Sequence, residues 1–320
     1  AKKVITMNAP IKMLVINPGS TSTKVGVFED ETLLFEETLR HPTEEIAKYA
    51  SVIDQKDFRK EIILDFLKEK DCDPKTLNVI VGRGGLLKPI PGGTYAVSDA
   101  LLADLKAGVQ GQHASNLGGI LAREIGDSLG VPSYIVDPVV VDELTDKARI
   151  SGMPELPRRS IFHALNQKAV ARRFAKENGK RYEDLNLIVC HVDGGITVTA
   201  HKAGRMVDST EGAGGDGPFT PTRLGSIPVM EVLQYLDEGH TTAQMRSMLS
   251  RSGGFVSHFG TSDAAKVHAL VDAGDKKAVT VWNAMIYQVI KYIGSMSTVL
   301  QGKVDGIVLT GGLLRFPEVE

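Results

Sequence analysis

The feature that most constrains the fold of this chain is a pattern of strands and small-residue loops that occurs twice. Residues 13–16 form a short apolar run that leads into a loop of small polar residues at 17–23. Alternating runs at 24–28 and 32–39 follow. The second half repeats this order at 186–191, 196–200 and 206–208, with unrelated residues. Such runs predict strands, so we expect two similar domains that each open on three strands.

Helices and further strands are expected after each set of three strands. In the first half the periodicity predicts helices at 58–67, 98–107 and 116–129 and strands at 79–81 and 133–136. In the second half it predicts helices at 229–236, 242–249, 262–273 and 276–301 and a strand at 304–309. This order indicates an α/β fold. A length of 320 residues favours two domains, and prolines and a basic pair place the boundary near residues 152–160. The expected domains are residues 12–155 and 156–320.

The composition excludes several classes of protein. The chain is 42% hydrophobic and 24% charged, which excludes a disordered protein. Its net charge of −2 gives no electrostatic attraction to nucleic acid or acidic membranes. No apolar run approaches the roughly 18 residues of a membrane span, and residues 1–12 carry no signal-peptide pattern. Cys72 and Cys190 lie far apart, and Cys190 falls in an apolar run, which indicates a buried thiol. We expect a soluble, cytoplasmic protein without nucleic-acid or membrane partners.

Three loops of small residues follow predicted strands, at 17–23, 192–195 and 310–312. Backbone N–H groups in such loops can hold phosphate oxygens. The spacing of a Walker A loop is absent, and each loop taken alone also fits a plain turn. Ligands of α/β folds lie at the carboxyl ends of strands and between domains, so we expect a phosphate site in a cleft between the two domains.

Six segments resemble the motifs of butyrate kinases, within the acetate and butyrate kinase family. They are residues 16–24 (INPGSTSTK), 81–89 (VGRGGLLKP), 108–119 (GVQGQHASNLGG), 136–144 (VDPVVVDEL), 160–169 (SIFHALNQKA) and 217–223 (GPFTPTR). The resemblance extends from about residue 12 to residue 312. It implies the fold of the sugar kinase, heat-shock protein 70 and actin superfamily, with two duplicated ribonuclease-H-like domains and a cleft between them.

The resemblance implies reversible, direct in-line transfer of a phosphoryl group from ATP to butyrate, giving ADP and butyryl phosphate with the help of Mg²⁺. Acetate, propionate and branched-chain acids are alternative substrates, because one methylene changes binding by only about 1–3 kcal/mol. A nucleotide-binding protein without catalysis is the alternative from another class. The joint presence of Arg83, Asp137, His163 and Arg223 disfavours it. A homodimer or higher homo-oligomer is implied by the resemblance alone.

The resemblance also assigns roles to individual residues. Arg83 and Arg223 are expected to neutralise the carboxylate and the moving phosphoryl group, because a guanidinium can donate two hydrogen bonds to the oxygens of either anion. His163 is expected to donate a hydrogen bond to that group, and Asp137 to position Mg²⁺. The implied phosphate- and nucleotide-binding residues are Asn17, Ser20, Thr21, His191, Asp193, Gly194, Gly195, Asp263, Gly311 and Gly312, and the implied acyl-pocket residues are Phe162 and Pro221. For Asp263 the alternative role is that of an acidic residue at a helix N-terminus, where its charge stabilises the helix dipole.

Five features depart from the family pattern. Asp193 stands where the family has glycine, so its carboxylate is expected either to repel phosphate or to serve Mg²⁺. Ala265 stands where relatives tend to have arginine, and residues 313–317 differ from the usual continuation. The sequence stops at Glu320, where relatives continue with a tail that carries an acidic Mg²⁺ residue. We expect that this tail is missing from the given sequence, and the alternative is a divergent member of the family. Residues 1–12 extend beyond the start of most members.

Overall fold

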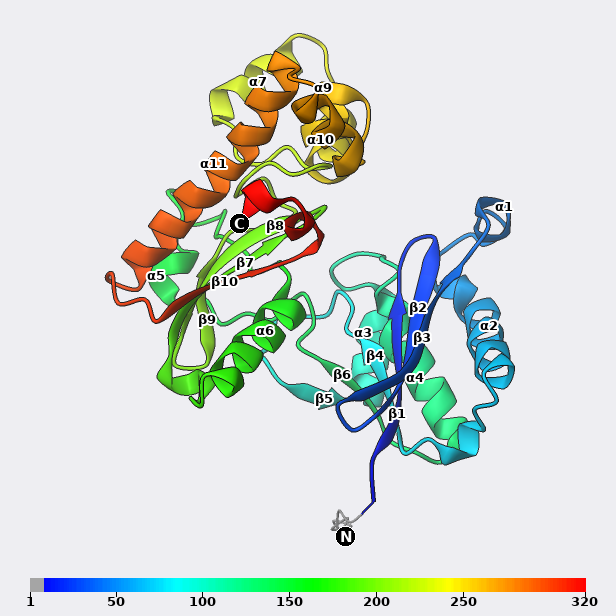
Figure 1. The fold of residues 1–320 in the computed structure, drawn as a ribbon. Coiled ribbons are helices and arrows are strands. Elements are labelled where there is room, and N and C mark those ends of the chain that lie inside the picture. The colour runs from blue at the N-terminus through cyan, green and yellow to red at the C-terminus, as the bar shows by residue number, and fades with distance from the viewer. Residues whose placement is uncertain (1–8) are drawn as a thin grey trace. The chain divides into compact units, whose positions relative to one another are not determined.

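The computed structural model describes residues 9–320, and its internal contacts divide the chain into two units, Ala1–Val140 and Val141–Glu320. Within the described residues the strands form one six-stranded sheet in the first unit and one four-stranded sheet in the second (Figure 1). The division precedes the boundary expected near residues 152–160. The functional limits 12–155 and 156–320, and a cleft between the domains, stay predictions.

The first sheet has the strand order β3-β2-β1-β4-β6-β5. Its strands are β1 (Lys12–Pro18), β2 (Ser22–Glu29), β3 (Thr32–Arg40), β4 (Val79–Arg83), β5 (Thr94–Ala96) and β6 (Ser133–Val136). The first three strands form an antiparallel meander, whereas β1, β4 and β6 run parallel. The carboxyl ends of these three parallel strands therefore lie at one edge of the sheet.

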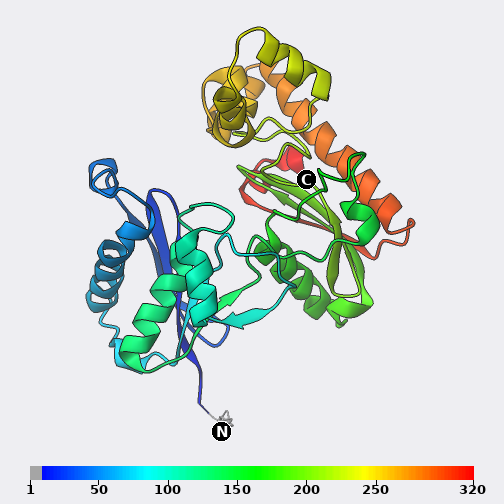
Figure 2. The same cartoon turned by 180° about the vertical axis from the view of Figure 1, so that it is seen from behind.

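Helices cover the first sheet, and Figure 2 shows α3 and α4 in front of its strands when the molecule is seen from behind. The helices of this unit are α1 (Thr43–Ile46), α2 (Lys56–Glu69), α3 (Asp99–Ala107) and α4 (Asn116–Leu129), with 3₁₀ turns η1 (Ile53–Gln55) and η2 (Pro74–Thr76), and α1 stands apart from the sheet. Two glycines let α4 approach β4 closely, because a Cβ on Gly82 would lie 2.0 Å from the carbonyl oxygen of Gly118. This contact requires glycine.

The second sheet has the order β10-β7-β8-β9, which matches β4-β1-β2-β3 of the first. Its strands are β7 (Asn186–Val192), β8 (Ile196–Lys202), β9 (Arg205–Ser209) and β10 (Gly306–Thr310). As in the first unit, a three-stranded antiparallel meander is followed by a parallel strand beside its first member. The predicted duplication is confirmed at the level of topology.

The helices of the second unit include three that the sequence does not predict. The helices of this unit are α5 (Asp146–Arg149), α6 (Ala164–Glu177), α7 (Val229–Asp237), α8 (Thr242–Ser247), α9 (Gly254–Phe259), α10 (Ala264–Asp272) and α11 (Lys276–Val299). Short turns are η3 (Tyr182–Asp184), the π-helical η4 (Met248–Ser252), η5 (Gly312–Arg315) and η6 (Pro317–Val319). The unpredicted helices are the short α5 and α9 and the longer α6. In Figure 1, α7, α9 and α10 gather at one end of the long α11.

The second sheet has two chemically different faces. Residues Ile196 and Val198 of β8 belong to an apolar core with Trp282 and Met285 of α11. The intervening residues Thr197, Thr199 and His201 point to the other face, since strand side chains alternate. All three are fully buried. Polar groups in the interior need hydrogen-bond partners, so these three side chains form a polar network. The same face also holds Leu187 and Val189 of β7, which pack in an apolar cluster with α6.

Two further expectations bear on the chain's surroundings. Cys72 and Cys190 are both unpaired and buried. Burial raises the pKa of Cys190 to about 12, which confirms the interpretation of this thiol as a small buried group. Within residues 9–320, no helix has the length and apolar character needed to span a bilayer.

Candidate functional site

In the first unit, the ends of the parallel strands bring predicted residues together. Asn17 lies near the end of β1 and Arg83 ends β4, and Arg83 Nη1 donates a hydrogen bond to Asn17 Oδ1 at 3.2 Å. Burial lowers the pKa of Arg83, although a guanidinium stays charged at working pH. His113 is a neighbour to which we assigned no role from the sequence. Burial and then the charge of Arg83 lower the pKa of His113, so this imidazole lies within the field of the arginine.

Asp137 follows β6 at the same edge of the sheet and is 1% exposed. Its Oδ1 accepts a hydrogen bond from Gly93 N at 2.7 Å, and its own N–H donates to Gly93 O at 3.0 Å. The φ of Asp137 is 37°, a conformation that an L-residue rarely adopts. The surrounding structure therefore fixes the Asp137 carboxylate and holds its backbone in a strained conformation, as is common at functional sites.

The loop at 17–23, predicted to bind phosphate, is shaped by a residue that we did not single out in the sequence. Arg59 of α2 is 1% exposed, and its Nη1 donates to Gly19 O at 2.8 Å and to Ser22 O at 3.1 Å. Nη2 donates to Ser20 O at 3.3 Å. The loop carbonyls thus point at α2, while the side chains of Ser20 and Thr21 are exposed.

Other buried groups accept the remaining hydrogen bonds of the Arg59 guanidinium. Its Nε and Nη2 donate to Gln55 Oε1 at 3.1 and 2.8 Å, and Nη1 also donates to Thr23 Oγ1 at 3.1 Å. Thr23 Oγ1 shares a further hydrogen bond of 2.8 Å with His41 Nε2. Burial, then the charge of Arg59, lowers the pKa of His41 to about 4. We call Gln55, Arg59, Thr23 and His41 the loop clamp.

In the second unit, Asp193 joins the two glycine loops. Its Oδ1 accepts from Gly194 N at 2.8 Å and its Oδ2 accepts from Gly312 N at 3.0 Å. The neighbouring Gly311 has φ 115°, and a Cβ there would lie 2.3 Å from Val192 O. The loops at 192–195 and 310–312 are therefore packed against one another and held by one carboxylate.

Arg223 lies beside the same loops. The hydroxyls of Thr220 and Thr222 donate to Gly194 O at 2.6 and 3.1 Å, which ties the Arg223 loop to the Asp193 loop. A Cβ on Gly195 would come within 2.7 Å of Arg223 Nη1, so glycine leaves the room that the guanidinium occupies.

The hydrogen bonding of Arg223 is incomplete within the described part of the chain. Nη1 donates to Gly212 O, but the buried Nε has no hydrogen-bond partner there. Burial lowers the pKa of Arg223. A buried donor without a partner is costly, and an anionic ligand would satisfy it.

Two histidines stack beside this arginine loop. The rings of His163 and His191 lie 3.8 Å apart with an interplanar angle of 15°. His163 Nδ1 shares a hydrogen bond of 2.9 Å with Thr197 Oγ1, and His191 Nδ1 shares one of 2.8 Å with Asn166 Oδ1. Burial lowers the pKa of His191 most, while Asp193 and Arg223 act on it in opposite directions.

A hollow of about 240 Å³ gathers several predicted residues of the second unit. It is lined by Asp193, Gly194, Pro221, Thr222, Ser262, Asp263, Ala264, Gly312, Leu313 and Arg315. The segment predicted to contact the nucleotide thus lies beside the two glycine loops. Arg315, to which we gave no role from the sequence, contributes a cation.

Two residues of this unit are placed differently from the others. Asp263 Oδ1 accepts from Ala265 N at 3.0 Å and from Lys266 N at 3.4 Å, so its carboxylate begins α10 as the alternative interpretation expects. Phe162 is 5% exposed and packs with Val141, Ala164 and Met206, whereas Pro221 lines the hollow beside Asp193. The two predicted acyl-pocket residues therefore belong to different surroundings.

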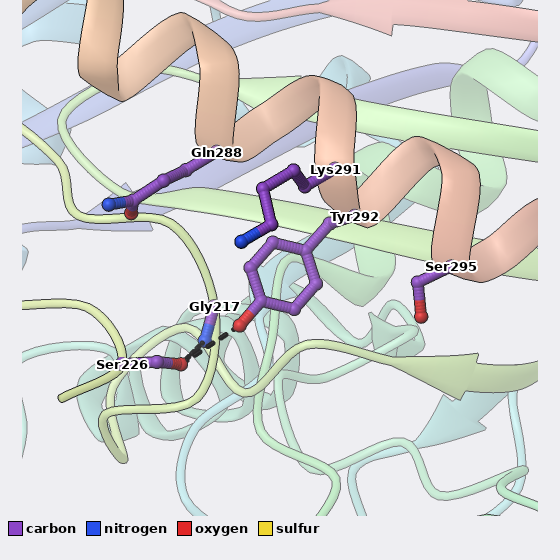
Figure 3. Close-up of a pocket in the computed structure, with 6 residues that line it drawn as sticks. All are labelled: Gly217, Ser226, Gln288, Lys291, Tyr292 and Ser295. Atoms are coloured by element: carbon purple, nitrogen blue, oxygen red, sulfur yellow. Dashed lines mark hydrogen bonds between the residues drawn. The ribbon is translucent and has the colours of Figure 1, made fainter. Parts of the chain in front are cut away.

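A second hollow, of about 330 Å³, lies between α11 and the loop that carries Arg223. Figure 3 shows Gln288, Lys291, Tyr292 and Ser295 projecting from α11 toward Gly217 and Ser226. Ser226 Oγ shares a hydrogen bond of 2.9 Å with Tyr292 and accepts from Gly217 N at 2.8 Å. Gln288 Oε1 accepts from Phe219 N at 3.0 Å, so α11 anchors both sides of this loop.

A metal cluster made by protein side chains alone is absent from residues 9–320, where no three His, Cys, Asp or Glu side chains meet. Mg²⁺ at phosphate sites uses one or two carboxylates and takes its other ligands from substrate and water. Asp137 of the first unit and Asp193 of the second are each a carboxylate of this kind, and each by itself fits as one ligand of Mg²⁺.

Comparisons with known proteins agree with these features. The model of the Acetokinase family matches residues 154–315. The chain is 56% identical over 307 residues to a protein named probable butyrate kinase from Clostridium botulinum, covering 96% of this chain and 86% of that protein. It is 54% identical over 303 residues to butyrate kinase 1 of Clostridium acetobutylicum, covering 94% and 85%.

Solved structures establish the fold. Acetate kinase from Porphyromonas gingivalis superposes with a TM-score of 0.76 at 21% identity, covering 95% of this chain and 83% of that one. Acetate kinase from Entamoeba histolytica gives a TM-score of 0.73 at 17% identity, covering 96% and 84%. The two similar sheets are those of the actin-like ATPase fold, as predicted. On sequence and fold together, the chain belongs to the Acetokinase family.

Proposed function

We propose that this protein is an ATP-dependent short-chain fatty acid kinase whose preferred substrate is butyrate. The observation that carries the proposal is the 56% identity over 96% of the chain with a protein named probable butyrate kinase. The hollow at Asp193 and Gly312, the buried Arg223 and the Asn17–Arg83 pair agree with binding of two anionic substrates.

In the proposed reaction a carboxylate oxygen of butyrate attacks the γ-phosphorus of ATP. The bond from phosphorus to the β–γ bridging oxygen breaks, and ADP leaves with that electron pair. The nucleophile is already ionised, so no general base is required. Catalysis therefore depends on position and charge neutralisation, as in other phosphoryl transfers.

Each unit supplies part of these requirements. In the first unit Arg83, held by Asn17, would neutralise the carboxylate and the transferring group. In the second unit Arg223 would use its unsatisfied Nε, and His163 would donate a hydrogen bond to the phosphoryl oxygens. Asp137 would hold Mg²⁺, which when bound neutralises phosphate charge. The glycine loops at 17–23, 192–195 and 310–312 would bind ATP phosphates through their N–H groups.

The proposal is tested by trapping the acyl phosphate product with hydroxylamine. The purified protein is incubated with ATP, Mg²⁺ and each acid from acetate to valerate, including branched isomers. An optimum at four carbons is expected. An optimum at another length would keep the chemistry and replace the substrate, whereas no product with any acid despite ATP binding would refute the kinase activity.

Location and assembly are separate parts of the proposal. We place the protein in the cytoplasm on the basis of its two unpaired, buried cysteines. We also propose a homo-oligomer, which the family resemblance supports. Light scattering of the purified protein measures its mass directly.

A further inference from the structure

A line of buried side chains leads from the interior of the second unit to His163. It runs from Tyr182 through His201, Gln167 and Thr197, which are at most 5% exposed. Gln167 lies on α6 one turn after His163, and its N–H donates to His163 O at 2.9 Å. Thr197 and His201 share the polar face of β8. We call these five residues the histidine relay.

The direction of each hydrogen bond in the relay follows from one backbone carbonyl. Thr197 O lies 3.3 Å from Gln167 Nε2. A carbonyl oxygen only accepts, so this end of the Gln167 amide must be the NH₂ group. The opposite end, Oε1, is then an acceptor.

Toward the interior, this assignment determines the state of His201. Its Nε2 lies 3.1 Å from Gln167 Oε1 and must therefore carry the proton. In a neutral ring Nδ1 is then bare, and it accepts from the Tyr182 hydroxyl at 2.7 Å. Burial and the charge of Lys168 lower the pKa of His201 to about 3, in agreement with a neutral ring.

Toward the site, the same assignment determines the state of His163. Gln167 Nε2 also donates to Thr197 Oγ1, at 3.2 Å. The hydroxyl proton of Thr197 then points to its other partner in the described chain, His163 Nδ1, at 2.9 Å. A protonated Nδ1 would instead leave that fully buried hydroxyl proton without an acceptor, which is costly.

We propose that Gln167 and Thr197 are positioning residues that hold His163 as the neutral tautomer with its proton on Nε2. The relay thereby makes Nε2 a hydrogen-bond donor before substrate arrives. Its value for phosphoryl transfer rests on the proposed function, because an Nε2–H group can donate to the oxygens of the moving phosphoryl group. The tautomer itself does not depend on the reaction.

The direct test is nuclear magnetic resonance of the histidine ring nitrogens in the protein without substrate. The chain has 8 histidines, and the signals of His163 are assigned by their loss in His163→Gln. We expect a bare Nδ1 and a protonated Nε2 in the unaltered protein. A protonated Nδ1 would overturn the proposal.

Substitutions of the relay provide the second test. Thr197→Val removes the hydroxyl at nearly constant volume, and we expect kcat to fall by about tenfold, the scale of one hydrogen bond, with KM within about twofold. Thr197→Ser should restore the tautomer and most of kcat. In Gln167→Glu the ionised carboxylate can only accept a hydrogen bond. The Thr197 hydroxyl should then donate to this carboxylate instead of to His163, and the His163 proton should move to Nδ1.

The matched control is Thr199→Val on the same buried face of β8. Thr199 Oγ1 shares its hydrogen bond of 2.7 Å with Ser209 and not with His163, so this variant should leave kcat and the tautomer unchanged. Equal effects of Thr197→Val and Thr199→Val would show a general packing defect and overturn the proposal. The expected tautomer in a protein that makes no acyl phosphate would refute the proposed function and leave the relay intact.

Discussion

Arg83 and Arg223 each occupy a position where the surrounding backbone leaves little freedom. Arg83 donates to Asn17, and its backbone packs against Gly118, where a Cβ would lie 2.2 Å from Arg83 O. Arg223 fits between Gly195 and Gly212. Because these cations are already held in place, they need little reorganisation when charge develops in the transition state. Preorganised donors of this kind contribute strongly to catalysis.

Replacing either arginine with alanine is expected to lower kcat by about 10²–10³, the scale of losing one transition-state donor. Acyl phosphate formation measures the rate, and circular dichroism checks the fold. Arg173→Ala is the matched control, because Arg173 pairs with Glu177 on the exposed side of α6. Full activity of Arg83→Ala or Arg223→Ala would remove that residue from the reaction.

Asp193 gives a second prediction at this scale, since its carboxylate joins Gly194 and Gly312. Asp193→Ala should release both N–H groups, loosen the hollow and weaken ADP binding several-fold in calorimetry. Asp193→Asn keeps one acceptor oxygen and should lose less. Tighter binding by both variants would show instead that the carboxylate repels nucleotide phosphates.

Single residues show where sequence reasoning reaches its limit. Asn17, Arg83 and Arg223 could be singled out because each lies in a segment that resembles a motif of the butyrate kinases. Arg59 and Thr197 could not, because their importance rests on partners that are distant in sequence. Arg59 binds carbonyls 37 to 40 positions earlier. Such pairings depend on tertiary packing and leave no local pattern.

At the scale of elements, the strands β7 and β8 were easier to predict than the helix α6. β7 and β8 alternate or run apolar as strands should. The helix α6 escapes prediction because its buried side includes Gln167 and Lys168 beside small alanines. Lys168 is buried with Glu143 at 2.6 Å, so ion pairing replaces the apolar stripe that marks most helices.

The loop clamp yields a prediction about an element. Arg59→Leu should free the carbonyls of Gly19, Ser20 and Ser22, raise hydrogen exchange of the loop at 17–23 and raise KM for ATP more than it lowers kcat. It should also destabilise the fold by about 2–3 kcal/mol, since buried acceptors lose a charged donor. Arg59→Lys keeps the charge without the fork and should fall in between.

The control for the clamp is Arg40→Leu, at the exposed edge strand β3. It should leave exchange of the loop at 17–23 unchanged. If Arg59→Leu leaves exchange and KM unchanged while only stability falls, the clamp supports the fold and not the loop.

For the whole molecule, the duplication explains why the two units resemble each other in topology while differing in chemistry. Both have the meander and the added parallel strand, and both place glycine loops at strand ends. The first unit supports its loop with the charged clamp, whereas the second supports His163 with a neutral relay. Repeated strand order was visible in the sequence, but these different supports were not.

The two supports have a common consequence for the whole molecule, because each contains a histidine that is neutral in the folded state. The pKa is lowered to about 4 for His41 and to about 3 for His201, in both cases chiefly by burial. An unfolded histidine has a pKa of about 6.5, so between about pH 6.5 and 4 the unfolded chain binds more protons than the folded one. The free energy of unfolding should therefore be constant with respect to these groups above about pH 6.5 and fall as the pH decreases toward 4.

Urea unfolding at a series of pH values measures this dependence. His41→Gln should make the decline shallower, because a glutamine takes up no proton on unfolding. His240→Gln is the control, since His240 stacks on Tyr235 at the exposed end of α7 and should leave the slope unchanged. A slope that is the same in all three proteins would mean that His41 is not held neutral, and the clamp would then have to accommodate an imidazolium beside the Arg59 guanidinium.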